Sequence, residues 1–257
     1  YYLFRTVGTV GHPSNQALTA TTGTFTGDVT IDTSTLKVDS ANNRVGVGTA
    51  SPASELTVAH ASGIDGRGIR LVNSSNSQTY ETRIGVQSLE NTSYAIKDIT
   101  QDAVRFLIDL NGHVTMPSQS AFLAKLSANQ TNITADGSHQ TVQFDTEIFD
   151  QNADFNHSNY TFTAPVTGKY HLSTVIYSEQ LDTDANFSYI TIKTSNRDAF
   201  LILTPKFSAD PSYWYFSGSL LMDMDASDTA HITYVQGTGA AQTDINATSY
   251  FSGYLVC

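Results

Sequence analysis

Apolar and polar residues alternate in short stretches along most of the chain, which predicts strands rather than helices. In residues 1–117 each stretch has only two or three apolar positions, as in residues 29–31, 36–38, 45–47, 56–58, 69–71 and 84–86. Turn residues such as Asn42-Asn43 and Asn111-Gly112 separate them,. We therefore predict two hairpins, one over residues 36–48 and one over residues 106–116.

Residues 98–107 allow a second interpretation. Ile99, Ala103 and Phe106 have the spacing of one helical face,. The hairpin over residues 106–116 competes for some of the same residues, so a helix and a strand both remain open here.

The chain divides near Pro117-Ser118, and residues 118–257 have longer alternating stretches. A segment of this length can bury a core of its own. The predicted strands cover residues 122–126, 142–145, 160–164, 170–177, 187–194, 199–203, 214–224, 231–235 and 250–256. We predict an all-β protein with a fibrous shaft over residues 1–117 and a globular head over residues 118–257.

Composition narrows the classes of partner. The net charge of −11 is unevenly distributed. Residues 1–117 carry 8 basic and 10 acidic groups, about −2, and residues 118–257 carry 5 basic and 14 acidic groups, about −9. An acidic head argues against nucleic acid as a partner, because phosphates need Lys and Arg. No stretch approaches the roughly 20 apolar residues of a membrane span. Cys257 is the only cysteine, which excludes an intrachain disulfide,. The chain starts at Tyr1 rather than Met, so we expect residues before it.

Two segments in the first half resemble a known module. The run from Val38 to Val58, with Gly46, Gly48 and Ser51-Pro52, and the earlier run over residues 23–31 are similar to the recurrent shaft module of bacteriophage tail fibres. Glycines permit close backbone approach, and Ser-Pro ends a strand. The alternative is a generic β-turn sequence. A monomer built from such short stretches would expose much apolar surface, so three chains side by side are expected to close it.

The second half resembles another family. Thr161 to Tyr170 forms a strand, a Pro165–Gly168 corner and a second strand, and Tyr250 to Val256 is apolar on both faces. With Phe144, Asp150, Phe155 and residues 217–219, this order resembles the head shared by complement component one, subcomponent q, and the tumour necrosis factor family. The resemblance implies a jelly-roll sandwich that works as a trimeric, non-enzymatic recognition module. Residues 226–228 depart from it, because Ala-Ser-Asp stands where the family often has Gly-Asp.

The last strand also gives a physical argument for a trimer. Phe251 and Leu255 fall on one face, and Tyr250, Tyr254 and Val256 fall on the other. Only one face can pack inside a sandwich, so we expect the second to meet a neighbouring subunit. A loop of the same chain is the alternative cover. The predicted interface residues are Phe122, Tyr170, Tyr250, Phe251 and Tyr254.

Receptor contact is predicted at Tyr213, Trp214 and Tyr215, because flat amphipathic rings can stack on a sugar face,. Alternation favours a core position for Trp214 and leaves the two tyrosines for binding. Asp182 and Asp184 add oxygen ligands to this candidate surface. They could serve calcium, as could residues 223–228, but neither group has the spacing of a calcium loop, so no cofactor or metal is predicted.

We find no nucleophile elbow, phosphate loop or usable Cys-His pair, so no catalytic residue is predicted. The sequence favours a virion fibre on the outside of a particle, non-enzymatic and homotrimeric. Its N-terminal end would join other virion proteins, and its head would bind a host-surface glycan or protein. A capsid-mounted decoration fibre, a polysaccharide-degrading tail spike and a secreted pattern-recognition protein with an upstream leader or collagen stem remain open.

Overall fold

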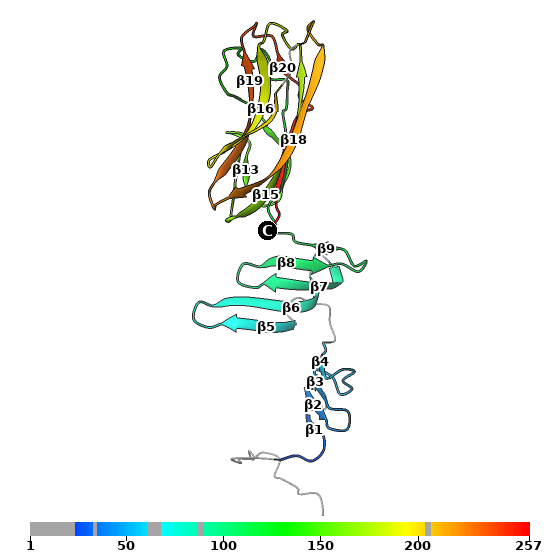
Figure 1. The fold of residues 1–257 in the computed structure, drawn as a ribbon. Helices are drawn as coiled ribbons and strands as arrows, with labels where there is room; N and C mark the ends of the chain where they lie inside the picture. The colour runs from blue at the N-terminus through cyan, green and yellow to red at the C-terminus, as the bar shows by residue number, and fades with distance from the viewer. Residues whose placement is uncertain (1–23, 33–34, 61–67, 87–89, 204–206) are drawn as a thin grey trace, which may run out of the picture. The chain divides into compact units, whose positions relative to one another are not determined.

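The computed structural model describes residues 24–32, 35–60, 68–86, 90–203 and 207–257 (Figure 1). Every regular element in these residues is a strand, which confirms the all-β class. None of the described segments forms a helix of the length and apolarity that a membrane crossing needs. Contacts divide the chain into two units, Tyr1–Gly68 and Ile69–Cys257. The predicted boundary near residue 117 stays a prediction.

The first unit contains a four-stranded sheet in the order β1-β2-β3-β4. Its strands are β1 (Val29–Ile31), β2 (Leu36–Asp39), β3 (Arg44–Val47) and β4 (Leu56–Val58). β2 and β3 pair antiparallel from Leu36↔Val47 to Asp39↔Arg44, which confirms the first predicted hairpin. A Cβ on Gly48, whose φ is +75°, would lie 2.1 Å from the Ala59 carbonyl oxygen, so this turn requires glycine,.

The second unit begins with a five-stranded sheet, named here the stem sheet, in the order β5-β6-β7-β8-β9. Its strands are β5 (Gly68–Asn73), β6 (Gln78–Val86), β7 (Glu90–Asp98), β8 (Ala103–Ile108) and β9 (Val114–Thr115). The hairpin over residues 106–116 is confirmed, because Ile108 pairs with Val114. The alternative helix over residues 98–107 is wrong. A turn after Asp98 lets Ala103 pair back with Asp98, so the segment joins a sheet.

Residues 121–257 form a sandwich of two six-stranded antiparallel sheets. The first sandwich sheet has the order β12-β10-β21-β15-β18, with β20 beside β15. Its strands are β10 (Ala121–Lys125), β12 (Thr146–Asp150), β15 (Gly168–Glu179), β18 (Tyr213–Met224), β20 (Asp244–Ile245) and β21 (Tyr250–Leu255).

The second sandwich sheet has the order β13-β14-β19-β16-β17, with β11 beside β19. Its strands are β11 (Gln140–Thr141), β13 (Phe155–Asn156), β14 (Thr161–Thr163), β16 (Phe187–Thr194), β17 (Asp198–Leu203) and β19 (Thr229–Gly237). Eight of the nine strands predicted for the head coincide with observed strands to within a few residues. The strand predicted at residues 142–145 is wrong. Val142 and Phe144 are buried, but here the chain crosses from β11 in one sheet to β12 in the other.

Phenylalanine rings fill the space between the two sheets. Phe122 of β10 stacks on Phe162 of β14 at a centroid distance of 4.8 Å and meets Phe251 of β21 edge-on at 5.0 Å. These rings are buried and belong to one continuous core. Side chains at alternate positions of the first sheet therefore point inward, and those between them form its outer face.

Candidate functional site

The outer face of the first sandwich sheet carries large apolar side chains exposed to solvent. The pairing of four strands places Ala121, Tyr254, His171 and Leu221 side by side. Tyr254 is 49% exposed and Leu221 is 60% exposed. The rings of His171 and Tyr254 lie 5.2 Å apart. A second row along the same face contains Tyr250, which is 36% exposed. We name Tyr250, Tyr254, His171 and Leu221 the sheet-face cluster.

Burial corrects part of the predicted subunit interface. Phe122, Tyr170 and Phe251 are at most 1% exposed, because they lie on the inner side of the same sheet. The Tyr170 hydroxyl donates a hydrogen bond of 2.7 Å to the Val166 carbonyl oxygen and so closes the corner between β14 and β15. These three side chains pack in the core of the sandwich and not on its outer face. For Tyr250 and Tyr254, contact with another subunit stays a prediction.

Three tyrosines gather at one end of this outer face. Tyr177 of β15 stacks on Tyr215 of β18 with ring centroids 4.6 Å apart and planes 14° apart. Tyr213 meets Tyr177 edge-on at 6.1 Å. Partial burial in this group, followed by the nearby Glu179 carboxylate, raises the pKa of Tyr177,. Tyr213 and Tyr215 stay more than half exposed. We name Tyr177, Tyr213 and Tyr215 the tyrosine patch.

Trp214 does not occupy the core position that alternation favours. Its side chain lies on the opposite side of β18 from the two tyrosines, yet it is 38% exposed. Its ring contacts Phe207 edge-on at 5.0 Å. Trp214 sits near the start of a long strand, whereas the buried inward positions begin at Phe216. A strand end that extends past the core leaves its inward residue partly open.

Asp182 and Asp184 lie in the turn between β15 and β16, at the same end as the tyrosine patch. Three hydrogen bonds join this turn to the segment before β18: the Gln180 amide donates to the Ser212 carbonyl oxygen, and the backbone amide and hydroxyl of Thr183 both donate to Asp210. The sequence prediction therefore named two groups of residues that the fold does bring together.

The carboxylate of Asp182 is occupied by the protein itself. It accepts hydrogen bonds from the backbone amides of Asp184 and Ala240. Asp210 accepts from the Thr183 hydroxyl and amide, which lowers the pKa of Asp210. These bonds fix the shape of the loops, and no metal-holding group of three or more ligands occurs among the described residues.

The other predicted acidic group also fixes a loop. Asp228 accepts hydrogen bonds from the Ser195 hydroxyl at 2.7 Å and the Asn196 side-chain amide at 2.6 Å. It also accepts from the Asp225 backbone amide, and together these donors lower its pKa. Ser227 has a φ of 77°, a conformation that favours glycine,. The departure of residues 226–228 from the family pattern thus places a serine at a position suited to glycine.

The strand registers show that the sheet-face cluster and the tyrosine patch lie far apart on the outer face. Tyr254 lies level with His171, whereas Tyr213 lies level with Glu179, eight residues further along β15. At about 3.3 Å per residue this is roughly 26 Å. The chain enters the head beside Tyr254, at Ala121, so the tyrosine patch is at the opposite end. In Figure 1 this far end is marked by β20, which pairs with Ser178 and Glu179. Sequence reasoning missed Tyr177, because its place beside Tyr215 depends on the register between β15 and β18.

Solved structures with a similar fold cover the head. The globular domain of zebrafish complement 1qA protein is 18% identical, with a TM-score of 0.39, and the match covers 54% of this chain and 98% of that one. Murine APRIL at pH 8.0 is 8% identical, with a TM-score of 0.39 and coverage of 54% and 99%. Eiger TNF from S. frugiperda is 12% identical, with a TM-score of 0.38 and coverage of 54% and 91%. No curated protein matches the sequence. The C1q domain model matches residues 121–256, more than half of the chain, and the chain therefore belongs to the C1q domain family.

Proposed function

We propose that this protein is a homotrimeric bacteriophage fibre whose head binds a receptor on the host cell surface without enzymatic chemistry. C1q-type domains are typically trimeric recognition modules. The resemblance of residues 23–58 to a tail-fibre shaft module supports the virion assignment. The N-terminal end would join other virion proteins, which places the head on the outside of the particle.

The main observation in support of a trimer is the sheet-face cluster. Tyr254 and Leu221 each leave about half or more of their surface in water, and both lie on a regular sheet face. Adjacent large apolar side chains on a sheet face mark an interaction surface. Copies of the same chain supply an equivalent apolar face, and closed symmetry makes three such contacts at once.

The tyrosine patch is the proposed receptor surface. It lies at the end of the head opposite the chain's entry, so a head carried on a stem would present it outward. Tyrosine rings can stack on the apolar face of a sugar or fill a hollow on a protein, while their hydroxyls form hydrogen bonds. The negative charge of the head disfavours a polyanionic receptor,. A trimer would present three tyrosine patches at once, so that avidity would strengthen weak single contacts.

Light scattering on the full chain at micromolar concentration tests the trimer. We expect three times the chain mass of 27.8 kDa. Leu221→Asp with Tyr254→Asp should dissociate it, because the change places carboxylates within the apolar contact. A monomeric wild-type protein would refute the trimer.

Adsorption to host cells tests the receptor surface. Tyr213→Ala with Tyr215→Ala should reduce adsorption on the order of tenfold or more while the mass stays trimeric. Phe200→Ala is the control, because it removes an equally exposed ring from β17 of the other sheet. Unchanged adsorption by the double variant would remove the tyrosine patch from the proposal and leave the trimer intact.

A further inference from the structure

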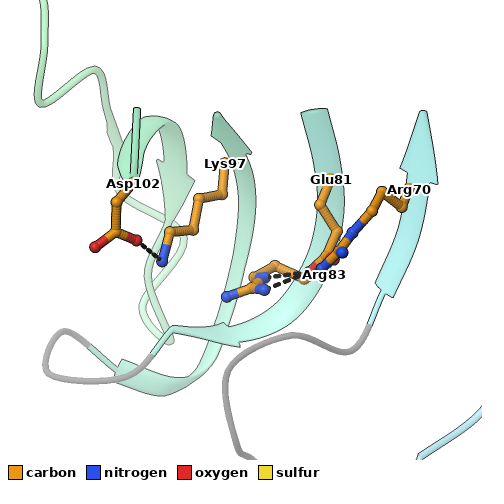
Figure 2. Close-up of polar contacts among 5 residues, drawn as sticks. All are labelled: Arg70, Glu81, Arg83, Lys97 and Asp102. Atoms are coloured by element: carbon orange, nitrogen blue, oxygen red, sulfur yellow. Dashed lines mark hydrogen bonds and ion pairs between the residues drawn. The ribbon is translucent and has the colours of Figure 1, made fainter. Parts of the chain in front are cut away.

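The stem sheet has its polar and apolar faces reversed relative to a sheet that meets water on one side. Glu81 and Arg83 of β6 are 1% and 3% exposed, and Ala95 and Lys97 of β7 are also buried. Figure 2 shows Arg70 and Arg83 converging on the carboxylate of Glu81. Arg83 Nε lies 2.7 Å from Glu81 Oε1, and Arg70 Nη2 lies 2.8 Å from Glu81 Oε2. The side chains of Glu81 and Arg83 are therefore buried within a single chain, whereas the Arg70 side chain stays 45% exposed.

The opposite face is apolar and open. Its central row crosses four strands, because Ile84 pairs with Tyr94, Tyr94 with Ile108 and Ile108 with Val114. Beside it, Ile96 pairs with Phe106. Ile84 and Val114 are each more than half exposed, and Tyr94 and Ile96 are each 37% exposed. These six residues define the open face of the stem sheet.

This arrangement is unfavourable for a sheet that ends in water. Removing an ion pair from water costs free energy, whereas removing isoleucine from water releases it. A solvated sheet would be expected to turn Glu81 and Arg83 outward and Ile84 and Ile96 inward. The sequence does the reverse, which is consistent with an open face that is also covered.

The open face suits a dry contact. No residue in its two rows is charged. The Thr82 hydroxyl donates a hydrogen bond of 2.8 Å to the Tyr94 hydroxyl oxygen, so both groups have a partner within the sheet. A partner surface therefore needs apolar side chains and no compensating charge, and the same face of a second copy supplies them.

We infer that the open face of the stem sheet packs against the same face of other copies of this chain and forms a second interface, separate from that of the heads. The inference rests on the proposed trimer, which supplies the copies. Only the five residues 116–120 join β9 to β10. Their reach is about 20 Å at full extension. Copies held by their heads would thus meet at an effective concentration on the order of millimolar.

The test uses the full chain carrying Ile84→Glu and Ile96→Glu. At a solvated position such changes alter stability little. At a buried contact they place two carboxylates per chain against apolar neighbours. We expect hydrogen exchange of the β6, β7 and β8 amides to accelerate on the order of tenfold or more, with head amides unchanged. The matched control is Leu110→Glu in the turn between β8 and β9, which is 69% exposed and outside the open face. It should leave exchange in the stem sheet unaltered.

Light scattering of the same samples separates the two proposals. A trimeric double variant with fast exchange in the stem sheet supports the second interface. A trimeric double variant with wild-type exchange overturns it and leaves the head trimer standing. A monomeric wild-type protein overturns the proposed trimer, and the second interface with it. Accelerated exchange in the Leu110→Glu control would assign the effect to added charge and also overturn the inference.

Discussion

Gly253 shows how a single residue sets the packing of the head. It lies on the inner side of β21, directly across from Phe122 of β10. A Cβ at this position would lie 2.7 Å from Leu172 Cδ2 and 2.8 Å from Phe122 Cε1. Both neighbours are buried side chains of the core, at most 1% exposed. The absence of a side chain at Gly253 therefore lets the Phe122 ring enter the core.

Gly253→Ala should destabilise the head by about 1–3 kcal/mol, because the added methyl group forces core side chains from their rotamers. Thermal unfolding followed by circular dichroism measures the change. Ser252→Ala is the control, because Ser252 faces the other way on the same strand. Equal unfolding temperatures for Gly253→Ala and the wild type would contradict this prediction, because the core would then accommodate the added methyl group without loss of stability.

At the scale of elements, the side chain of Asp228 joins two turns, one within the second sandwich sheet and one that links the two sheets. Its carboxylate oxygens accept hydrogen bonds from Ser195 and Asn196 in the turn between β16 and β17. They also accept one from the Asp225 backbone amide in the turn between β18 and β19. These bonds require the carboxylate, and they lower its pKa below the usual value. Such a group stabilises the fold above the unfolded-state pKa, about 3.9, and the contribution is lost as the pH falls through the folded-state pKa.

Asp228→Asn should therefore lower the unfolding temperature at pH 7, because an amide replaces an oxygen that accepts hydrogen bonds. The difference from the wild type should shrink as the pH falls below about 4, where the wild-type carboxyl loses the same advantage. Unfolding temperatures measured from pH 7 down to pH 3 test this. Asp184→Asn, an exposed carboxylate in another turn, serves as the control. A difference that stays constant with pH would contradict the assigned role of the carboxylate.

On the scale of the whole molecule, the proposed trimer joins two apolar faces in one chain, the sheet-face cluster of the head and the open face of the stem sheet. Neither face is covered by the described part of its own chain. If both are buried only between copies, folding and association are one process, and stability depends on protein concentration.

For reversible unfolding, tenfold dilution should lower the unfolding temperature by about 2–4 °C, because a trimer that dissociates on unfolding loses about 0.9 kcal/mol per chain. Differential scanning calorimetry at two concentrations, with a second scan to confirm refolding, measures the shift. A reversible transition at the same temperature for both concentrations would contradict coupled folding and association.

The sequence alone determined the all-β class, both predicted hairpins, nearly every strand of the head and the grouping of acidic and aromatic candidates. These features depend on alternation, turn residues and spacing, which act over a few neighbouring positions. It could not place the crossover at residues 142–145, whose buried Val142 and Phe144 alternate as a strand does. It also could not tell that Phe251 lies inside and that Trp214 lies partly open.

Only the tertiary structure decided which face of each strand meets the core, because that depends on the register of strands far apart in sequence. The register of β15 with β18 set Tyr177 on Tyr215, and that of β15 with β21 set His171 beside Tyr254. In the stem sheet, pairing placed Glu81 and Arg83 inside and Ile84 and Ile96 outside, against the ordinary polarity of a sheet. The alternation of side chains along one strand is the same whichever face is buried. Which face is buried is therefore decided by how the strands pair and pack in the folded protein.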